Sequence, residues 1–198
     1  MVSDEAMFKA RSQYQKLGCL GTAIAIRSAF PILGMIASYA LCNYIAAERE
    51  WAANRIAFVF AIAGFTTLLA MLLVQMAVVS GMAEITRDLD ASTAKVLRRS
   101  MRMIDLGLDV AWDLLFGTAM ILWGFALRKR SGFGPGWGFP SMALGGLLII
   151  LNVAAFPWPP GSRGSFDLGP VAGIFMLALN IRLAFLGRHA HAGSASVR

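Results

Sequence analysis

The sequence predicts an all-α fold, a helical integral membrane bundle with about five transmembrane helices in a single domain over residues 1–198. The chain is 58% hydrophobic and only 15% charged, whereas soluble domains carry about 25% charged residues. Its apolar residues form runs of roughly 18–25, the length that crosses a hydrocarbon core about 30 Å thick. The predicted spans cover residues 17–46, 55–83, 104–128, 139–156 and 169–187.

The first predicted helix follows a polar tail over residues 1–16. No cleavable signal peptide is expected, because the tail is mixed in charge and the first apolar run is too long for one. Pro31 lies inside this helix and predicts a kink, since it lacks a backbone N–H. Arg27 lies about ten residues into the same helix, and the second helix has Gln75 as its one strongly polar interior residue.

The third helix is expected to begin near Ser92, because Asp88, Asp90 and Ser92 are residue types that cap helix N-termini. It continues to Arg130. A helix of this length measures roughly 55 Å and exceeds the bilayer, so its first turns are expected to project into water.

Three aspartates follow one another at intervals of four in this third helix, so their carboxylates share one face. Asp105 is expected at the membrane interface, paired with Arg102 in a structural role. Asp109 is expected near headgroup depth. Asp113 is the deepest and is the main candidate for function, with an internal salt bridge as the alternative.

The glycine- and proline-rich segment Ser131–Pro140 is predicted to be a loop, because a nucleotide-binding glycine motif requires a preceding strand. The fourth helix is rich in glycine, which suits close packing of helices. The fifth helix follows the connection Pro157–Gly169. Residues 188–198, which include His189 and His191, are predicted to form a disordered tail.

Five spans place the two termini on opposite sides of the membrane. The side of the N-terminus holds nine Lys and Arg residues and the other side holds eight, when those near the ends of the spans are included, so the positive-inside bias is small. We expect a cytoplasmic N-terminus, because a short charged tail without a signal seldom crosses.

The predicted topology gathers polar groups of several helices in the leaflet on the N-terminal side. A charge at bilayer depth costs a few kcal/mol or more and usually faces the bundle interior or water. We therefore expect a polar pocket open toward that side, in which Arg27 pairs with Asp109 or Asp113. The candidate ligand- or ion-binding residues are Asp113, Asp109, Arg27, Gln75 and Asn152.

Several classes of function lack their usual residues. No histidine lies in a predicted span, so haem, di-iron and zinc sites lose their usual ligand, and no cofactor or metal is expected. No catalytic residues are identified, since the companion half of the CDP-alcohol phosphotransferase motif and the context of an intramembrane aspartyl protease are both missing. The net charge of +7 comes from clusters beside apolar runs, which are typical of membrane anchors rather than nucleic-acid binding.

Three hypotheses of function remain open. The first is a non-enzymatic membrane protein whose polar pocket binds a small molecule, a lipid headgroup or a proton. The second is a small transporter or channel subunit that uses Asp113 as a proton or cation site and forms a homo-oligomer, although paired half-length repeats are missing. The third is a membrane enzyme that acts on lipid.

The segments WDLLFGTAMILWGFALRKR (residues 112–130) and FDLGPVAGIFMLALNIRL (residues 166–183) flank a glycine-rich span. In this C-terminal half the chain resembles uncharacterised bacterial multi-pass membrane proteins of unknown function, through its apolar residues and a few Gly, Pro and Asp positions. The resemblance implies a protein of the bacterial inner membrane and supplies no known catalytic residues.

Overall fold

The structure is a computed structural model that describes residues 4–48, 52–85, 89–157 and 168–195. These residues form five helices and no strand. The helices are α1 Asp4–Ala46, α2 Ala52–Ile85, α3 Ala91–Leu127, α4 Pro135–Ala155 and α5 Gly169–Ala195. Each contains a stretch long and apolar enough to cross a membrane. The prediction of an all-α helical bundle is confirmed, and its five apolar helices are compatible with a multi-pass membrane protein.

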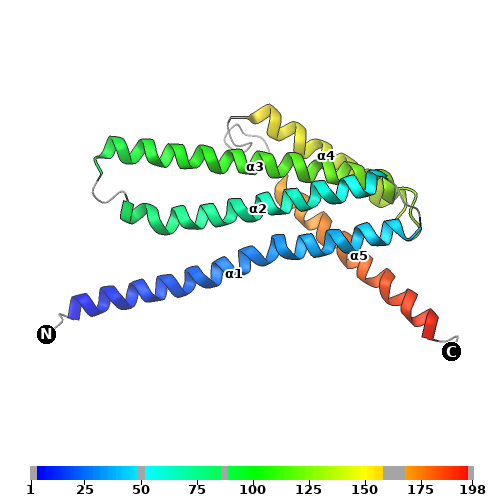
Figure 1. The fold of residues 1–198 in the computed structure, drawn as a ribbon, viewed down its shortest axis with the longest axis horizontal. Coiled ribbons are helices and arrows are strands. Elements are labelled where there is room, and N and C mark those ends of the chain that lie inside the picture. The colour runs from blue at the N-terminus through cyan, green and yellow to red at the C-terminus, as the bar shows by residue number, and fades with distance from the viewer. Residues whose placement is uncertain (1–3, 49–51, 86–88, 158–167, 196–198) are drawn as a thin grey trace.

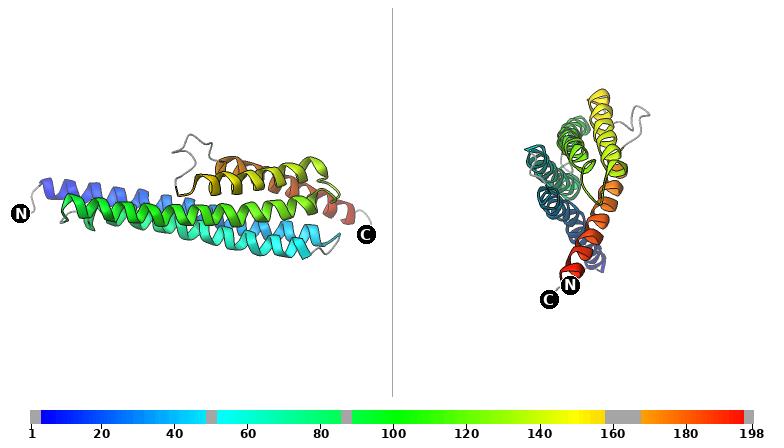
Figure 2. Two further views of the ribbon diagram at one scale, coloured as in Figure 1. Left: turned by 90° about the horizontal axis from the view of Figure 1, so that it is seen from above. Right: turned by 90° about the vertical axis from the view of Figure 1, so that its right-hand side faces the viewer.

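The helix α3 lies at the centre of the bundle, with α2 packed on one side and α4 on the other. The helices α1, α2 and α3 lie side by side, and α5 crosses the others obliquely (Figures 1 and 2). Because α1 packs against α2 and hardly touches α3, a residue of α1 can meet α3 only where α2 leaves room.

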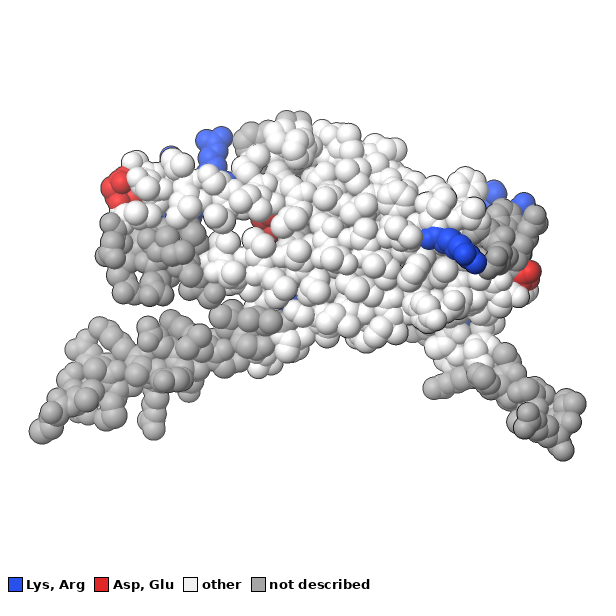
Figure 3. All heavy atoms as spheres, viewed as in Figure 1, with Lys and Arg blue, Asp and Glu red and all other residues white. Residues whose placement is uncertain are grey.

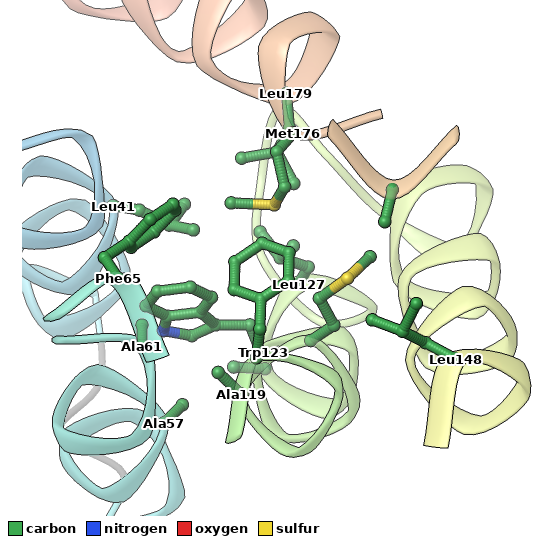
Figure 4. Packing of buried hydrophobic residues seen from close by; sticks show 14 of the residues in the cluster. Leu41, Ala57, Ala61, Phe65, Ala119, Trp123, Leu127, Leu148, Met176 and Leu179 are labelled. Atoms are coloured by element: carbon green, nitrogen blue, oxygen red, sulfur yellow. The ribbon is translucent and has the colours of Figure 1, made fainter. Parts of the chain in front are cut away.

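The apolar core gathers around Trp123 of α3. Figure 4 shows its indole ring between the α2 residues Ala57 and Ala61 on one side and the α5 residues Met176 and Leu179 on another. The two alanines bring the backbone of α2 close to the ring. The core therefore joins α2, α3 and α5 in the half of the bundle that contains the end of α3.

The helices α3 and α4 approach each other at glycines. A Cβ atom built on Gly117 would lie 2.8 Å from the carbonyl oxygen of Gly145, and one built on Gly124 would lie 2.7 Å from that of Gly138. Real side chains do not approach so closely, so these positions require glycine. The expectation that glycines of the fourth helix serve close packing is confirmed.

Three predicted boundaries differ from the structure. The helix α1 starts at Asp4, so most of the predicted polar tail is helical, because polar and charged residues propagate a helix readily. The helix α5 continues to Ala195 and includes most of the predicted disordered tail. The helix α4 starts at Pro135, where the fixed φ of proline suits the first helical position, so the predicted loop at residues 131–140 is shorter.

The start of α3 agrees with the sequence-based prediction. The carboxylate of Asp90 accepts hydrogen bonds from the backbone N–H groups of Ser92 at 2.9 Å and Thr93 at 3.0 Å. The hydroxyl groups of Ser92 and Thr93 also donate to this carboxylate, and chiefly these two bonds, followed by the backbone ones, hold the pKa of Asp90 well below its usual range. Asp88 lies outside the described residues. The long α2–α3 pair extends past the end of α4 (Figure 1), as expected from its length.

Charged side chains lie mainly at the two ends of the face drawn in Figure 3, and the surface between them is largely uncharged apart from an acidic side chain. This distribution is typical of a protein whose long axis crosses a bilayer. The polar groups in the middle of the bundle are therefore the ones that need a physical account.

Candidate functional site

One polar stripe on α3 runs from the exposed end of the helix into the bundle. Arg98 and Arg102 are exposed, Asp105 and Asp109 are half-buried, and Asp113 is only 3% exposed. Asp113 is therefore the most buried of the three carboxylates within the bundle. Asp113 lies about 21 Å along the helix from Leu127, at 1.5 Å per residue.

The stripe turns around α3 as it descends. Four residues advance a helix by about 400°, so each aspartate points about 40° further round than the one before. Asp105 faces α2, where its Oδ1 accepts a hydrogen bond of 2.8 Å from Nε2 of Gln75. Asp113 lies one turn before Gly117, the glycine that packs against α4. The three carboxylates therefore connect the α2–α3 interface with the α3–α4 interface.

The partner of Asp105 differs from the expected one. The sequence predicts a pair with Arg102 one turn earlier, but Arg102 is exposed and Gln75 of α2 donates to the carboxylate instead. The amide can do so because the antiparallel packing of α2 and α3 brings Gln75 to the level of Asp105. Gln75 is thus an interhelical hydrogen-bond partner, as expected.

Asn152 of α4 lies at the level of Asp113. Gly117 contacts Gly145 and Ile149 across the interface, and α3 and α4 run antiparallel. One turn further toward the N-terminus of α3, which is also toward the C-terminus of α4, the next residues on the two facing helices are Asp113 and Asn152. Both are buried, since Asn152 is 4% exposed.

The amide of Asn152 is only half satisfied. Its Nδ2 donates to the carbonyl oxygen of Leu148 at 3.0 Å, one turn back on the same helix. Its Oδ1 is buried and accepts no hydrogen bond from any residue in the described part of the chain. The indole Nε1 of Trp112, beside Asp113 on α3, is also buried without an acceptor, while its ring stacks on Phe116. Orphaned polar atoms of this kind are rare in native proteins and often mark a functional position.

Arg27 does not join this group in the structure. Its side chain is exposed on α1, and no ion pair of the described residues links it to Asp109 or Asp113. The physical reason is the position of α2, which lies between most of α1 and α3. Sequence depth alone placed Arg27 and the aspartates in the same leaflet and could not show which helices are neighbours.

Asn54 falls just before the predicted second span, at residues 55–83, but it is a buried polar residue in the structure. It is 1% exposed at the start of α2. Its Nδ2 donates to the carbonyl oxygen of Cys42 on α1 at 2.8 Å, and its Oδ1 accepts from Nε1 of Trp123 on α3 at 3.1 Å. A single amide thereby links three helices. The available signal was Trp123, because a buried indole N–H usually finds an acceptor.

A second polar group, the closing cluster of Tyr44, Glu48, Arg130 and Ser131, lies at the opposite end of the bundle. Glu48 forms an ion pair with Arg130 and accepts from Oγ of Ser131 at 3.0 Å. Chiefly the hydrogen bond from Ser131, and then Arg130, lower the pKa of Glu48. The hydroxyl of Tyr44 donates to the carbonyl oxygen of Ser131 at 3.0 Å. This cluster ties the end of α1 to the loop after α3.

Arg182 of α5 lies at the same end of the bundle as this cluster. Its guanidinium donates to the carbonyl oxygen of Gly132 at 3.1 and 3.2 Å, so it binds α5 to the same loop. Gly132 has a φ of +86°, a backbone conformation that residues with a side chain rarely adopt.

Within the described residues, no group of three or more His, Cys, Asp or Glu side chains is arranged to hold a metal ion. Searches of protein-family models, curated proteins and solved structures find no match to this chain. The function must therefore be inferred from the residues themselves.

Proposed function

We propose that this multi-pass membrane protein binds a proton reversibly at Asp113, in a polar site between α3 and α4 inside the membrane. The observation that carries the proposal is a carboxyl side chain that is 3% exposed at the level of Asn152, whose Oδ1 has no donor. Gln75, Asp105 and Asp109 form the polar approach to this site.

Asp113 is buried inside the bundle. An ionised carboxylate at this depth costs several kcal/mol unless it is compensated. A bound proton removes the charge and converts the acceptor-only carboxylate into a donor. That donor would lie at the level of Asn152, whose buried Oδ1 accepts from none of the described residues.

Among the described residues, the polar groups of α3 lead to Asp113 from one side. Toward the N-terminal end of α3 the stripe becomes more exposed, from the half-buried Asp109 and Asp105 to the exposed Arg102. Toward the other end, Gly117 packs against Gly145 and Ile149, and the buried Met120 and Trp123 follow. A proton can therefore exchange with water on the N-terminal side while the far side stays closed, which favours binding over transport.

Infrared spectroscopy of the protein in lipid tests the proposal, because a protonated carboxyl group has a carbonyl stretch distinct from that of a carboxylate. Wild type is expected to show this band at neutral pH and to lose it reversibly as the pH is raised. Asp113→Asn is expected to lack the band.

The matched control is Asp105→Asn, since Asp105 lies on the same stripe at the more exposed end and accepts from Gln75. It is expected to keep the band. The proposal fails if wild type shows no protonated carboxyl at neutral pH, or if Asp113→Asn leaves the band unchanged.

The proposed cellular setting is the bacterial inner membrane, with the N-terminus in the cytoplasm. The resemblance of the C-terminal half to bacterial multi-pass proteins supports the first part, and the slight excess of Lys and Arg on the N-terminal side supports the second. In this orientation Asp113 exchanges its proton with the cytoplasm. A reporter fused to the N-terminus and active only in the cytoplasm checks the orientation.

A further inference from the structure

Arg128, the first residue after α3, carries a charge that the described residues leave uncompensated. Its side chain forms no ion pair and no hydrogen bond with any described residue, and its Nε is buried without an acceptor. Arg130, two residues further along, instead pairs with Glu48 and lies over the ring of Tyr44 at 4.2 Å. Of these two arginines, Arg130 has an acidic partner among the described residues and Arg128 has none.

The guanidinium of Arg128 is held in place despite its missing partner. Its Cζ lies 5.1 Å from the ring centroid of Phe125 on α3 and 5.3 Å from that of Phe139 on α4. Its aliphatic stem packs where Gly138 has no side chain. Cation–π contacts on two sides orient the planar group while leaving its N–H donors unused.

The two phenylalanines face outward. Phe125 is 40% exposed and Phe139 is 54% exposed, and the same outer face of α4 continues with exposed Leu147, Ile150 and Val153. Arg128 follows directly after the apolar stretch that ends at Leu127. The charge therefore lies at the level of lipid headgroups, above an apolar face at the level of acyl chains.

We infer that Arg128, Phe125 and Phe139 form a binding site for an anionic phospholipid at the end of α3 opposite to the proton site. The phosphate accepts hydrogen bonds from the guanidinium, which matches a phosphate in two-point geometry. An acyl chain lies along Phe139 and the outer face of α4. Basic positions between membrane helices are typical sites for acidic headgroups.

Native mass spectrometry of the detergent-purified protein with added phosphatidylglycerol or phosphatidylcholine tests this inference. Wild type is expected to retain phosphatidylglycerol in preference to phosphatidylcholine. Arg128→Gln is expected to bind phosphatidylglycerol about tenfold more weakly or worse, because a charge-assisted contact is lost. Arg130→Gln is the matched control, because Arg130 lies two residues from Arg128 and its charge is already compensated by Glu48. This variant should keep the preference for phosphatidylglycerol.

Two further measurements sharpen the test. The first, with Arg128→Lys, distinguishes a two-point phosphate contact from a simple point charge. The second, with inorganic phosphate, distinguishes a phospholipid from a free anion. Arg128→Lys keeps the charge and the stem, so it should fold and bind phosphatidylglycerol at an intermediate level; wild-type binding would mean that only the point charge matters and would contradict the two-point site. Inorganic phosphate should leave the thermal stability of wild type unchanged. An Arg128-dependent stabilisation by inorganic phosphate would identify a free anion as the occupant, and wild-type lipid retention by Arg128→Gln would overturn the site altogether.

Discussion

Asn54 and Asn152 are both amides buried among membrane-spanning helices, but the chain satisfies them differently. Asn54 donates to Cys42 on α1 and accepts from Trp123 on α3, so both ends of its amide are used between helices. Asn152 donates within its own helix, and its Oδ1 has no donor. An amide that is fully used between helices stabilises the fold. One that is half used costs free energy unless something else completes it, and the proton proposed at Asp113 would do so.

The largest effect is expected from Asn54→Ala. This change leaves the indole N–H of Trp123 and the carbonyl of Cys42 without their partners and opens a small cavity where three helices meet. The free energy of unfolding should fall by about 2–4 kcal/mol. Denaturant titration in detergent measures the loss. A loss below that of Asn152→Leu would invert the comparison between the two amides.

A smaller effect is expected from Asn152→Leu. It removes an orphaned acceptor, which is also the acceptor proposed for the proton on Asp113. Interhelical hydrogen bonds in membranes are worth roughly 0.6–1.7 kcal/mol, so we expect a loss of about 1 kcal/mol.

The infrared carbonyl band assigned to Asp113 should shift in the same variant, because its hydrogen bond has changed. Gln75→Leu serves as the control, since Gln75 bonds to Asp105 and not to the α3–α4 site. If the band of Asn152→Leu stays at the wild-type position, Asn152 is not a hydrogen-bond acceptor of the proton site.

The smallest effect is expected for Arg27→Gln. Arg27 is exposed on α1, so this change should alter the free energy of unfolding by less than about 0.5 kcal/mol. Combined with Asp113→Asn, the two effects should add within about 0.5 kcal/mol, since residues that share no contact do not couple. A larger coupling term would restore the predicted salt bridge and with it a charged rather than a protonated Asp113.

Much of the candidate site could be predicted from spacing and depth. The interval of four placed Asp105, Asp109 and Asp113 on one face, and the helix register identified Asp113 as the deepest. Gln75 was recognised as an interhelical partner because a polar side chain inside an apolar run needs another helix. The prediction that Arg102 is the partner of Asp105 was wrong, because the register between α2 and α3 brings Gln75 to this carboxylate.

Asn54 illustrates a different gap. Beside Arg55 and close to charged residues, it fits the pattern of a connection, and nothing local marks it as buried. Its role follows from the approach of Cys42 and Trp123, which lie 12 and 69 residues away along the chain. Contacts over such separations are not visible in a local pattern.

The sequence by itself determined the class of this protein, its five apolar helices and the depth of its polar residues, because run length and helical rise are local properties of the chain. Only the tertiary structure decided which polar groups meet. It set Gln75 against Asp105, Asn152 at the level of Asp113 and Glu48 against Arg130, and it left Arg27 apart. The reason is that helix neighbours and their register depend on packing, on glycines such as Gly117 and Gly145 that let two helices approach, and on the place of α2 between α1 and α3.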